Sequence, residues 1–260
     1  MFDQIVLHIW FRIRARHRKG RGIHPPFAYK FITEVIFGND VPGLRGIEDL
    51  RGSLLGNREY LQVSDLGAGS KRIAGEKRSI PHLVKYTAVN RKKGQLLSRI
   101  AGYLGFPVFV ELGTGTGISS LYLGMACPHS RILTCEGSPE IADLARANIK
   151  KMGASNIEVY QDAFLDWLPG ILNQITGEVS IFLDGDHKGE NLLEYCSMII
   201  ESDLSKAVLV LDDIHWSVNM YRAWKKLVKR PDVSLSLELF NTGIIFMGYD
   251  IQKSHFIVNF

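Results

Sequence analysis

The sequence is poor in the features that would place it outside the ordinary globular proteins. It has three cysteines among 260 residues, Cys127, Cys135 and Cys196, and no C-x-x-C pair, so we expect neither a disulfide framework nor a zinc knuckle, and a cytoplasmic location. The longest apolar run near the start, residues 5–11, is interrupted by His8 and is far shorter than the roughly 20 residues that span a bilayer. Because the N-terminal arginines follow this run instead of preceding it, we expect neither a signal peptide nor a transmembrane helix.

The composition is that of a folded protein, but its charge is divided unevenly. Apolar residues make up 46% of the chain and charged residues 22%, and the net charge is +4. Residues 1–100 carry 19 Lys and Arg against 8 Asp and Glu, whereas residues 101–260 carry 12 against 19. We therefore expect a basic N-terminal extension over residues 1–90 and a second domain over residues 91–260. The extension either meets an anionic lipid, a nucleic acid or an acidic substrate, or attracts the acidic half of the same chain.

From residue 108 onward, short β-branched runs alternate with amphipathic stretches of helical length. This alternation predicts an α/β fold of the Rossmann-like, doubly wound type. The expected parallel strands are five near-continuous apolar runs, at residues 108–112, 131–136, 157–162, 179–184 and 207–213. A turn at residues 241–243 joins two further strands into an antiparallel C-terminal hairpin, so the expected sheet has seven strands and is mostly parallel, with residues 256–260 as a last extended piece.

The N-terminal extension is expected to be partly helical. Phe2, Ile5, Ile9 and Ile13 have helical spacing, and this apolar face covers the core or a homodimer partner, or it docks on a membrane surface. The prolines of the HPPF segment at residues 24–27 are expected to stop any helix, and a second helix is expected after Gly94.

A glycine-rich turn follows the first expected strand of the second domain. Residues 111–117 read Glu-Leu-Gly-Thr-Gly-Thr-Gly and lead into a helix, which lets the backbone approach a ligand closely. The dinucleotide pattern G-x-G-x-x-G fails, because Ile118 or Ser120 stands where the third glycine is needed. A nicotinamide oxidoreductase is therefore disfavoured, and S-adenosylmethionine is the expected ligand. A similar segment at residues 64–70 precedes a charged, Gly- and Pro-containing stretch, which indicates a basic loop.

Three acidic residues match the groups of this nucleoside. Glu111 is expected to hold the ammonium, Glu136 the ribose hydroxyls and Asp162 the adenine amino group, all at the strand ends where open α/β sheets bind ligands. Ser119 and the helix N-terminus suit the carboxylate. In a simpler alternative, Glu136 and Asp162 only cap the helices that follow them. The expected cofactor-binding residues are Glu111, Gly113, Thr114, Gly115, Gly117, Ser119, Glu136, Gly137, Ser138, Asp162, Ala163 and Asp184.

These motifs resemble the catechol and caffeoyl-CoA type cation-dependent O-methyltransferases, which are class I S-adenosylmethionine-dependent enzymes. Within residues 94–124, the family motif E-h-G-x-x-x-G-x-S is matched by Glu111, Gly113, Gly117 and Ser119. The likeness extends over about half of the chain, roughly residues 92–217, and leaves residues 1–90 unmatched. It continues through Glu136, QDA at 161–163, LDGDH at 183–187 and LDDIHWS at 211–217.

The resemblance implies a divalent metal, with Mg²⁺ the expected ion, held by Asp184, Asp212 and Asp213. Asp213 stands where most of that family has Asn, and the Asp-Asp pair resembles macrocin-type sugar O-methyltransferases. Three carboxylates are hard oxygen ligands that suit Mg²⁺, which lowers the pKa of a bound hydroxyl. His187 stands where the family often has a lysine base, and His215 is the second candidate base. In a simpler alternative, the adjacent aspartates cap the next helix and His215 is a packing residue.

The sequence thus predicts an S-adenosylmethionine-dependent methyltransferase that methylates a hydroxyl of a small molecule with the help of a divalent cation. An RNA or other nucleic-acid methyltransferase that uses the basic extension is the first alternative. Against it, the fourth strand ends in LDGDH and not in N/D-P-P-Y, and no Pro-Cys pair is present for methylation of a base carbon. The second alternative is a non-catalytic binding module that keeps the cofactor fold.

Overall fold

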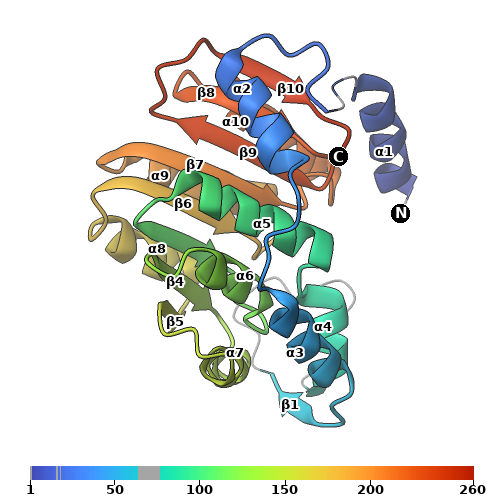
Figure 1. The fold of residues 1–260 in the computed structure, drawn as a ribbon, viewed down its shortest axis with the longest axis vertical. Coiled ribbons are helices and arrows are strands. Elements are labelled where there is room, and N and C mark those ends of the chain that lie inside the picture. The colour runs from blue at the N-terminus through green and yellow to red at the C-terminus, as the bar shows by residue number, and fades with distance from the viewer. Residues whose placement is uncertain (1, 16, 18, 64–76) are drawn as a thin grey trace. The chain divides into compact units, whose positions relative to one another are not determined.

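The computed structural model describes residues 2–15, 17, 19–63 and 77–260, so the segment at residues 64–70, together with Lys71 and Arg72, lies outside the described residues. The chain forms two compact units. Figure 1 shows their helices and strands, coloured by residue number. The first unit contains residues 1–39 and 168–260, and the second contains residues 40–167. These bounds differ from the division expected at residue 90, because residues 1–39 contact the C-terminal part of the chain.

The main sheet has eight strands and is mostly parallel, which confirms the predicted α/β fold. It has one strand more than expected because β10 (Ser254–Ile257), which overlaps the last extended piece of the prediction at residues 256 and 257, pairs in parallel with β8 (Val233–Glu238). The C-terminal hairpin is confirmed, since β8 pairs antiparallel with β9 (Thr242–Met247).

In the second unit, three parallel strands carry the glycine turn. β3 (Val108–Leu112), β4 (Arg131–Glu136) and β5 (Ile157–Gln161) are neighbours in this order. They alternate with α6 (Ile118–Ala126) and α7 (Pro139–Lys151), as the apolar periodicity predicts. The helix α5 (Arg91–Leu104) begins three residues before Gly94, because the Asn90 side chain caps it by accepting a hydrogen bond from the Lys93 amide at 2.9 Å.

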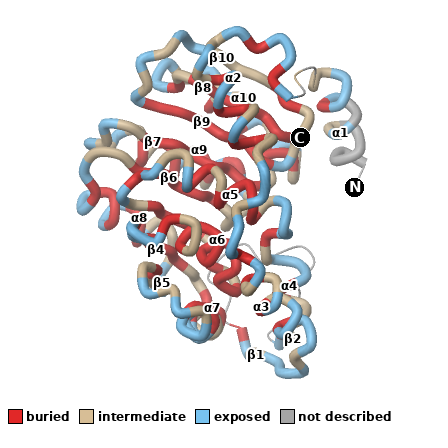
Figure 2. Tube along the Cα trace, in the orientation of Figure 1, coloured by how far each residue is buried: buried red, intermediate tan, exposed pale blue. Residues whose placement is uncertain are grey.

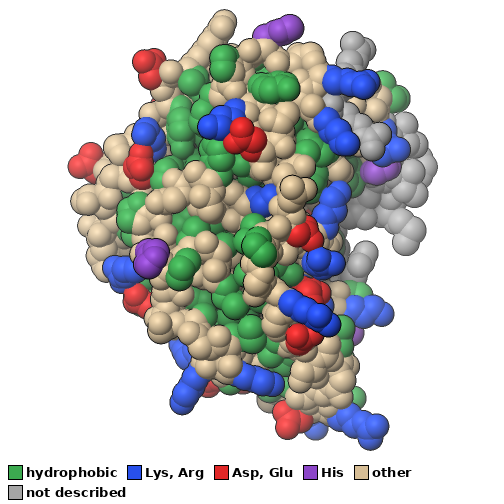
Figure 3. Space-filling view, viewed as in Figure 1, with side chains coloured by type: hydrophobic (Ala, Val, Ile, Leu, Met, Phe, Trp, Pro, Cys, Tyr) green, Lys and Arg blue, Asp and Glu red, His purple; other side chains and the backbone are tan. Residues whose placement is uncertain are grey.

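The residues between 40 and 90 add helices that the sequence pattern did not reveal. α3 (Arg45–Leu55) and α4 (Ile80–Thr87) pack on each other, and a short ladder joins β1 (Tyr60–Gln62) to β2 (Lys77–Ser79). Basic residues here pair locally, since Arg91 contacts Asp40 at 2.7 Å. In Figure 3, Lys and Arg side chains are interspersed with Asp and Glu side chains. Part of the N-terminal positive charge is therefore neutralised within this unit.

In the first unit, the strands lie in the order β10-β8-β9-β7-β6. β6 (Gly177–Leu183) and β7 (Leu204–Asp212) are parallel, and β7 pairs antiparallel with β9. The helices α9 (Gly189–Glu201) and α10 (Val218–Lys229) contact each other, and α8 (Phe164–Leu172) precedes β6. Every residue of β9 is buried, and Figure 2 shows this strand in the colour of buried residues. The core of this unit therefore lies along β9 and its neighbours.

The N-terminal segment of the first unit forms the predicted helix α1 (Phe2–Arg14). Phe11 is buried against Phe240, with ring centroids 5.2 Å apart, whereas Ile13 is 67% exposed. The prediction that the HPPF segment stops any helix is wrong in part. α2 (Pro26–Phe31) starts within this segment, because proline is tolerated in the first turn of a helix. A π-helix, η1 (Ile32–Ile36), follows. None of the helices in the described residues has the length and apolar character needed to cross a bilayer.

Candidate functional site

The glycine turn between β3 and α6 has the backbone that its sequence demands. Gly113, Gly115 and Gly117 have φ angles of 102°, 52° and 82°, in the left-handed region that favours glycine. The amides of Gly113 and Thr114 donate to the Cys135 carbonyl of β4 at 3.0 and 3.2 Å. The turn is therefore fixed to the neighbouring strand, and Gly117 leads into the N-terminus of α6, where the backbone N–H groups favour an anion.

Glu111 lies in the interior beneath this turn and has no exposed surface. Its Oε2 accepts hydrogen bonds from the hydroxyls of Ser120 and Thr134, the latter at 2.7 Å. Burial raises the pKa of the Glu111 carboxyl, and the hydroxyls of Ser120, Thr134 and Ser119 oppose the shift. The other oxygen, Oε1, is buried without a hydrogen-bond partner. A buried carboxylate oxygen without a partner is costly for the fold, and a cationic or N–H donor from a ligand would satisfy it.

The carboxylates of Glu136 and Asp162 follow adjacent parallel strands, since Glu136 pairs in register with Gln161. Both engage backbone amides. Glu136 accepts from Gly115 at 2.9 Å and from Ser138 at 3.1 Å, and Asp162 accepts from the Ala163 amide at 2.8 Å. Glu136 thus ties the glycine turn to the start of α7, which agrees with the expected edge position and also with the simpler capping role. Asp162 is exposed.

The second unit contains eleven of the twelve predicted cofactor residues, all but Asp184. They lie at the C-terminal ends of β3 and β4 and on the segments that follow β3, β4 and β5. Ser119 is buried in the first turn of α6, and Thr114 is buried, with its hydroxyl 2.6 Å from that of Thr134. Gly137, Ser138 and Ala163 follow the ends of β4 and β5. The sequence did not predict the roles of Thr134 and Ser120, whose hydroxyls donate hydrogen bonds to Glu111. Ser120 stands beside the motif serine, whereas no sequence signal marks Thr134.

The predicted metal ligands lie in the first unit, after β6 and β7. Asp184 and Asp212 follow the register partners Leu183 and Leu211 of these parallel strands. Asp212 is buried and accepts from the amide of Asp213, whose φ is 49° and whose Oδ2 lies 4.0 Å from His187 Nε2. Within the described residues, no three His, Cys, Asp or Glu side chains are arranged as a metal site. The donor chemistry fits Mg²⁺, but Asp213 faces His187.

The two candidate bases have contrasting surroundings. The His187 side chain is 29% exposed and lies 5.4 Å from the Trp216 ring. His215 is buried, with Nδ1 donating to the Phe240 carbonyl and Nε2 lying 3.4 Å from Glu238 Oε1. Only His187 is placed to meet a substrate from solvent.

A neighbouring aspartate holds the segment that carries His187. Asp186 has a φ of 54°, and its Oδ2 accepts hydrogen bonds from Asn191 and Tyr195. These contacts connect the segment after β6 to α9. Sequence reasoning passed over Asp186, although it lies inside the quoted LDGDH motif.

The fold and the glycine turn define a class of protein: an α/β nucleoside-binding domain of the Rossmann-like type with acidic residues at its strand ends. Comparison with known families then identifies the domain, since the family described as "Methyltransferase domain" matches residues 110–214. This chain therefore contains a methyltransferase domain.

The relatives agree with this identification. The chain is 32% identical over 130 residues to catechol O-methyltransferase of Mycobacterium tuberculosis (strain ATCC 25618 / H37Rv). The aligned region covers 49% of this chain and 57% of that protein. It is 26% identical over 238 residues to tricin synthase 2 of Oryza sativa subsp. japonica, and that alignment covers 88% of this chain and 78% of that protein. A solved O-methyltransferase from Bacillus cereus in complex with SAH, 18% identical, superposes with a TM-score of 0.56 over 84% of this chain and 95% of that chain. The structural likeness shows the fold alone.

Proposed function

We propose that this chain is an S-adenosylmethionine-dependent O-methyltransferase that acts on a hydroxyl of a small molecule. The observation that carries the proposal is the buried Glu111, whose Oε1 has no hydrogen-bond partner beneath a turn of three left-handed glycines. An ammonium group, held directly or through a water, is the donor that such an oxygen lacks. The match to catechol O-methyltransferase supports an acceptor of the catechol type.

Different residues of the second unit bind different groups of the cofactor. Glu111 takes the ammonium, Ser119 and the N-terminus of α6 take the carboxylate, Glu136 takes the ribose hydroxyls and Asp162 takes the adenine amino group. When bound, S-adenosylmethionine supplies a methyl group on a positively charged sulfur. Holding the sulfonium and the acceptor oxygen in line is the main task of the protein in such a displacement.

The residues of the first unit prepare the acceptor. Asp184, Asp212 and Asp213 hold a divalent cation, which when bound lowers the pKa of the acceptor hydroxyl. Their carboxylate oxygens suit Mg²⁺. His187 takes the proton of the acceptor hydroxyl, and Asp213, 4.0 Å away, stabilises the ring once it is protonated. The three cysteines are buried and free, which agrees with a reducing compartment such as the cytoplasm.

Titration of S-adenosylhomocysteine, followed by methyl transfer to catechol with and without Mg²⁺, tests the proposal. Asp184→Asn and Asp212→Asn are each expected to lower the affinity for Mn²⁺ by more than about tenfold, because each removes a charged ligand. The matched control is Asp203→Asn, at an exposed position outside the site. Calorimetric Mn²⁺ binding as tight in both variants as in the parent would remove the metal from the mechanism. Absence of any binding of the nucleoside would overturn the function as a whole.

His187→Gln is expected to lower kcat about 100-fold and to leave the affinity for S-adenosylhomocysteine unchanged, because a positioned base contributes that order of rate. The comparison variant His215→Gln is expected to act on folding instead, since that ring is buried against Phe240 and Glu238. Steady-state kinetics and thermal unfolding of both variants separate the two roles. Full activity of His187→Gln would show that another group takes the proton.

A further inference from the structure

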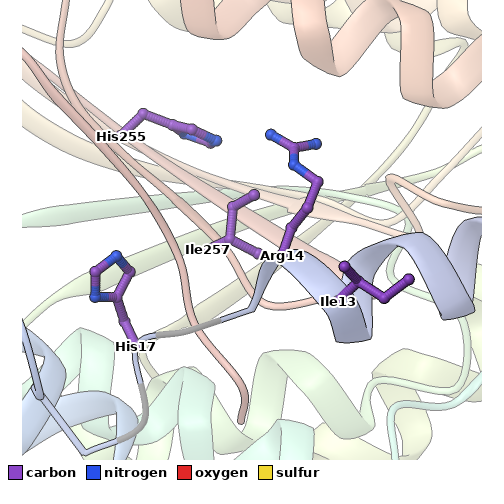
Figure 4. A pocket seen from close by; sticks show the side chains of 5 residues that line it. All are labelled: Ile13, Arg14, His17, His255 and Ile257. Carbon is purple, nitrogen blue, oxygen red and sulfur yellow. The ribbon is translucent and has the colours of Figure 1, made fainter.

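A pocket in the first unit is lined by none of the residues assigned to the cofactor, the metal or the proton transfer. Its volume is about 370 Å³, and it is lined by Ile13 and Arg14 of α1, by His17, and by His255 and Ile257 of β10 (Figure 4). Two of these side chains are apolar and three carry nitrogen, and none of the five is acidic. This volume falls within the range of small-molecule sites, and the lining combines apolar walls with a few polar groups as such sites do.

The nitrogen-bearing side chains are held in place by contacts at the edge of the pocket. Arg14 Nη1 donates to the Tyr221 hydroxyl at 3.1 Å, and this bond uses one of the five N–H groups of the guanidinium. His17 Nδ1 donates to the Arg21 carbonyl at 3.0 Å, so its Nε2 points away from that carbonyl. In Figure 4 the guanidinium of Arg14 and the ring of His255 point toward the same space.

The cationic side chains of Arg14 and Lys225 and the buried carboxylate of Glu238 act on His255 at the pocket wall. His255 is fixed by Ser236, 2.8 Å from its Nδ1, and lies 3.8 Å from the buried Glu238. Glu238 is already engaged by Trp224 at 2.9 Å and by His215 at 3.4 Å. Burial and the charges of Arg14 and Lys225 lower the pKa of His255, whereas Glu238 opposes this shift. The Arg14 guanidinium, which keeps its charge at any physiological pH, would attract an anion into the pocket.

We propose that this pocket binds a phosphate monoester, with the Arg14 guanidinium on the phosphate, His17 and His255 beside it, and Ile13 and Ile257 against the organic part. A guanidinium matches two phosphate oxygens with parallel hydrogen bonds. Three nitrogen-bearing groups, from α1, from His17 and from β10, suit the three terminal oxygens of a monoester better than the two of a carboxylate. The site is independent of the proposed methyl transfer.

Two sources supply this chemistry, a soluble phosphate ester and the headgroup of phosphatidic acid. The second source is relevant because Trp10 and Ile13 of α1 are 61% and 67% exposed. Large apolar side chains beside a cationic helix face favour the interface of an anionic membrane. The chemistry at Arg14 is the same in both cases.

The test is calorimetric titration of the full chain with phenyl phosphate, together with flotation on phosphatidylcholine vesicles with and without phosphatidic acid. Arg14→Met is expected to weaken phenyl phosphate binding at least about tenfold, because it removes a charge-assisted hydrogen bond. The matched control is Arg12→Met, which removes the same charge from the last turn of α1 at an exposed position that does not line the pocket. It is expected to bind phenyl phosphate like the parent.

The vesicle arm identifies the source. Flotation that requires phosphatidic acid and is lost in Arg14→Met but kept in Arg12→Met assigns the site to the lipid headgroup, whereas phenyl phosphate binding without flotation assigns it to a soluble ester. His255→Gln is expected to weaken binding as well, so the test stands if Arg14→Met does not fold. No binding of phenyl phosphate to the parent, or equal losses in Arg14→Met and Arg12→Met, would overturn the proposal. Affinity for S-adenosylhomocysteine is expected to be the same in all variants.

Discussion

Replacing Glu111 by glutamine is expected to weaken the binding of S-adenosylmethionine about 30-fold or more, while it makes the unliganded protein more stable above the ordinary pKa of glutamate. The affinity falls because the variant removes one partner of a buried charge pair, a loss of about 2 kcal/mol or more. The stability rises because the free protein no longer buries a carboxylate oxygen that lacks a hydrogen-bond partner.

The difference in stability between the parent and Glu111→Gln is expected to change with pH in a defined direction. Burial raises the pKa of Glu111 above its ordinary value of 4.5, with a smaller contribution from the charge of Glu136. As the pH rises from that ordinary value toward the raised one, the unfolded chain releases its proton first, so the free energy of unfolding of the parent falls. The variant has no such proton to release. Its stability advantage over the parent is therefore expected to be smallest at acid pH and to grow through this window.

Urea unfolding at several pH values from 4.5 upward, together with calorimetric titration of the cofactor, measures both effects. Glu158→Gln is the matched control, because Glu158 is 43% exposed and pairs with Arg131 at 2.9 Å on the surface. It is expected to change neither quantity appreciably. Cofactor binding that is as tight in Glu111→Gln as in the parent would show that Glu111 does not hold the ammonium.

The parts of the fold that depend on local pattern were predictable from the sequence. The apolar runs at residues 108–112 and 131–136 became β3 and β4 with the predicted bounds, because strands buried on both faces need continuous apolar residues. The glycines at 113, 115 and 117 indicated a left-handed turn, and all three have positive φ. Here a short stretch of chain determines the conformation.

The parts that depend on contacts between distant residues were not predictable. Thr134 and Glu111 are 23 residues apart, and they meet because β3 and β4 pair in parallel with these two residues in register. Pro26 starts α2 although the same residue type ends other helices, because the outcome depends on the residues after it. His215 was the second candidate base, with a packing role as the simpler alternative. Only the pairing of β9 with both β7 and β8 reveals that the His215 ring faces Glu238.

Glu238→Leu is expected to lower the free energy of unfolding by about 3–5 kcal/mol, because it leaves buried donors without their acceptor. Glu238 is 1% exposed, and it accepts from Trp224 Nε1 at 2.9 Å and faces His215 Nε2 at 3.4 Å. The same substitution at Glu178 is the control, because its bond to Lys206 at 2.6 Å joins side chains that are 38% and 41% exposed. A surface pair of this kind contributes at most about 1 kcal/mol.

The acid dependence of the Glu238 variant provides a second readout with a defined direction. Hydrogen bonds from His215 and Trp224, and the charge of His255, lower the pKa of Glu238 despite its burial. The contribution of this carboxylate is therefore complete above its ordinary pKa of 4.5 and is lost as the pH falls through the lowered value in the folded state. Denaturant unfolding of parent and variant across this acid range is expected to show their difference in stability shrinking. A difference that stays constant to the lowest pH would mean that packing, and not the charge of Glu238, stabilises this part of the first unit.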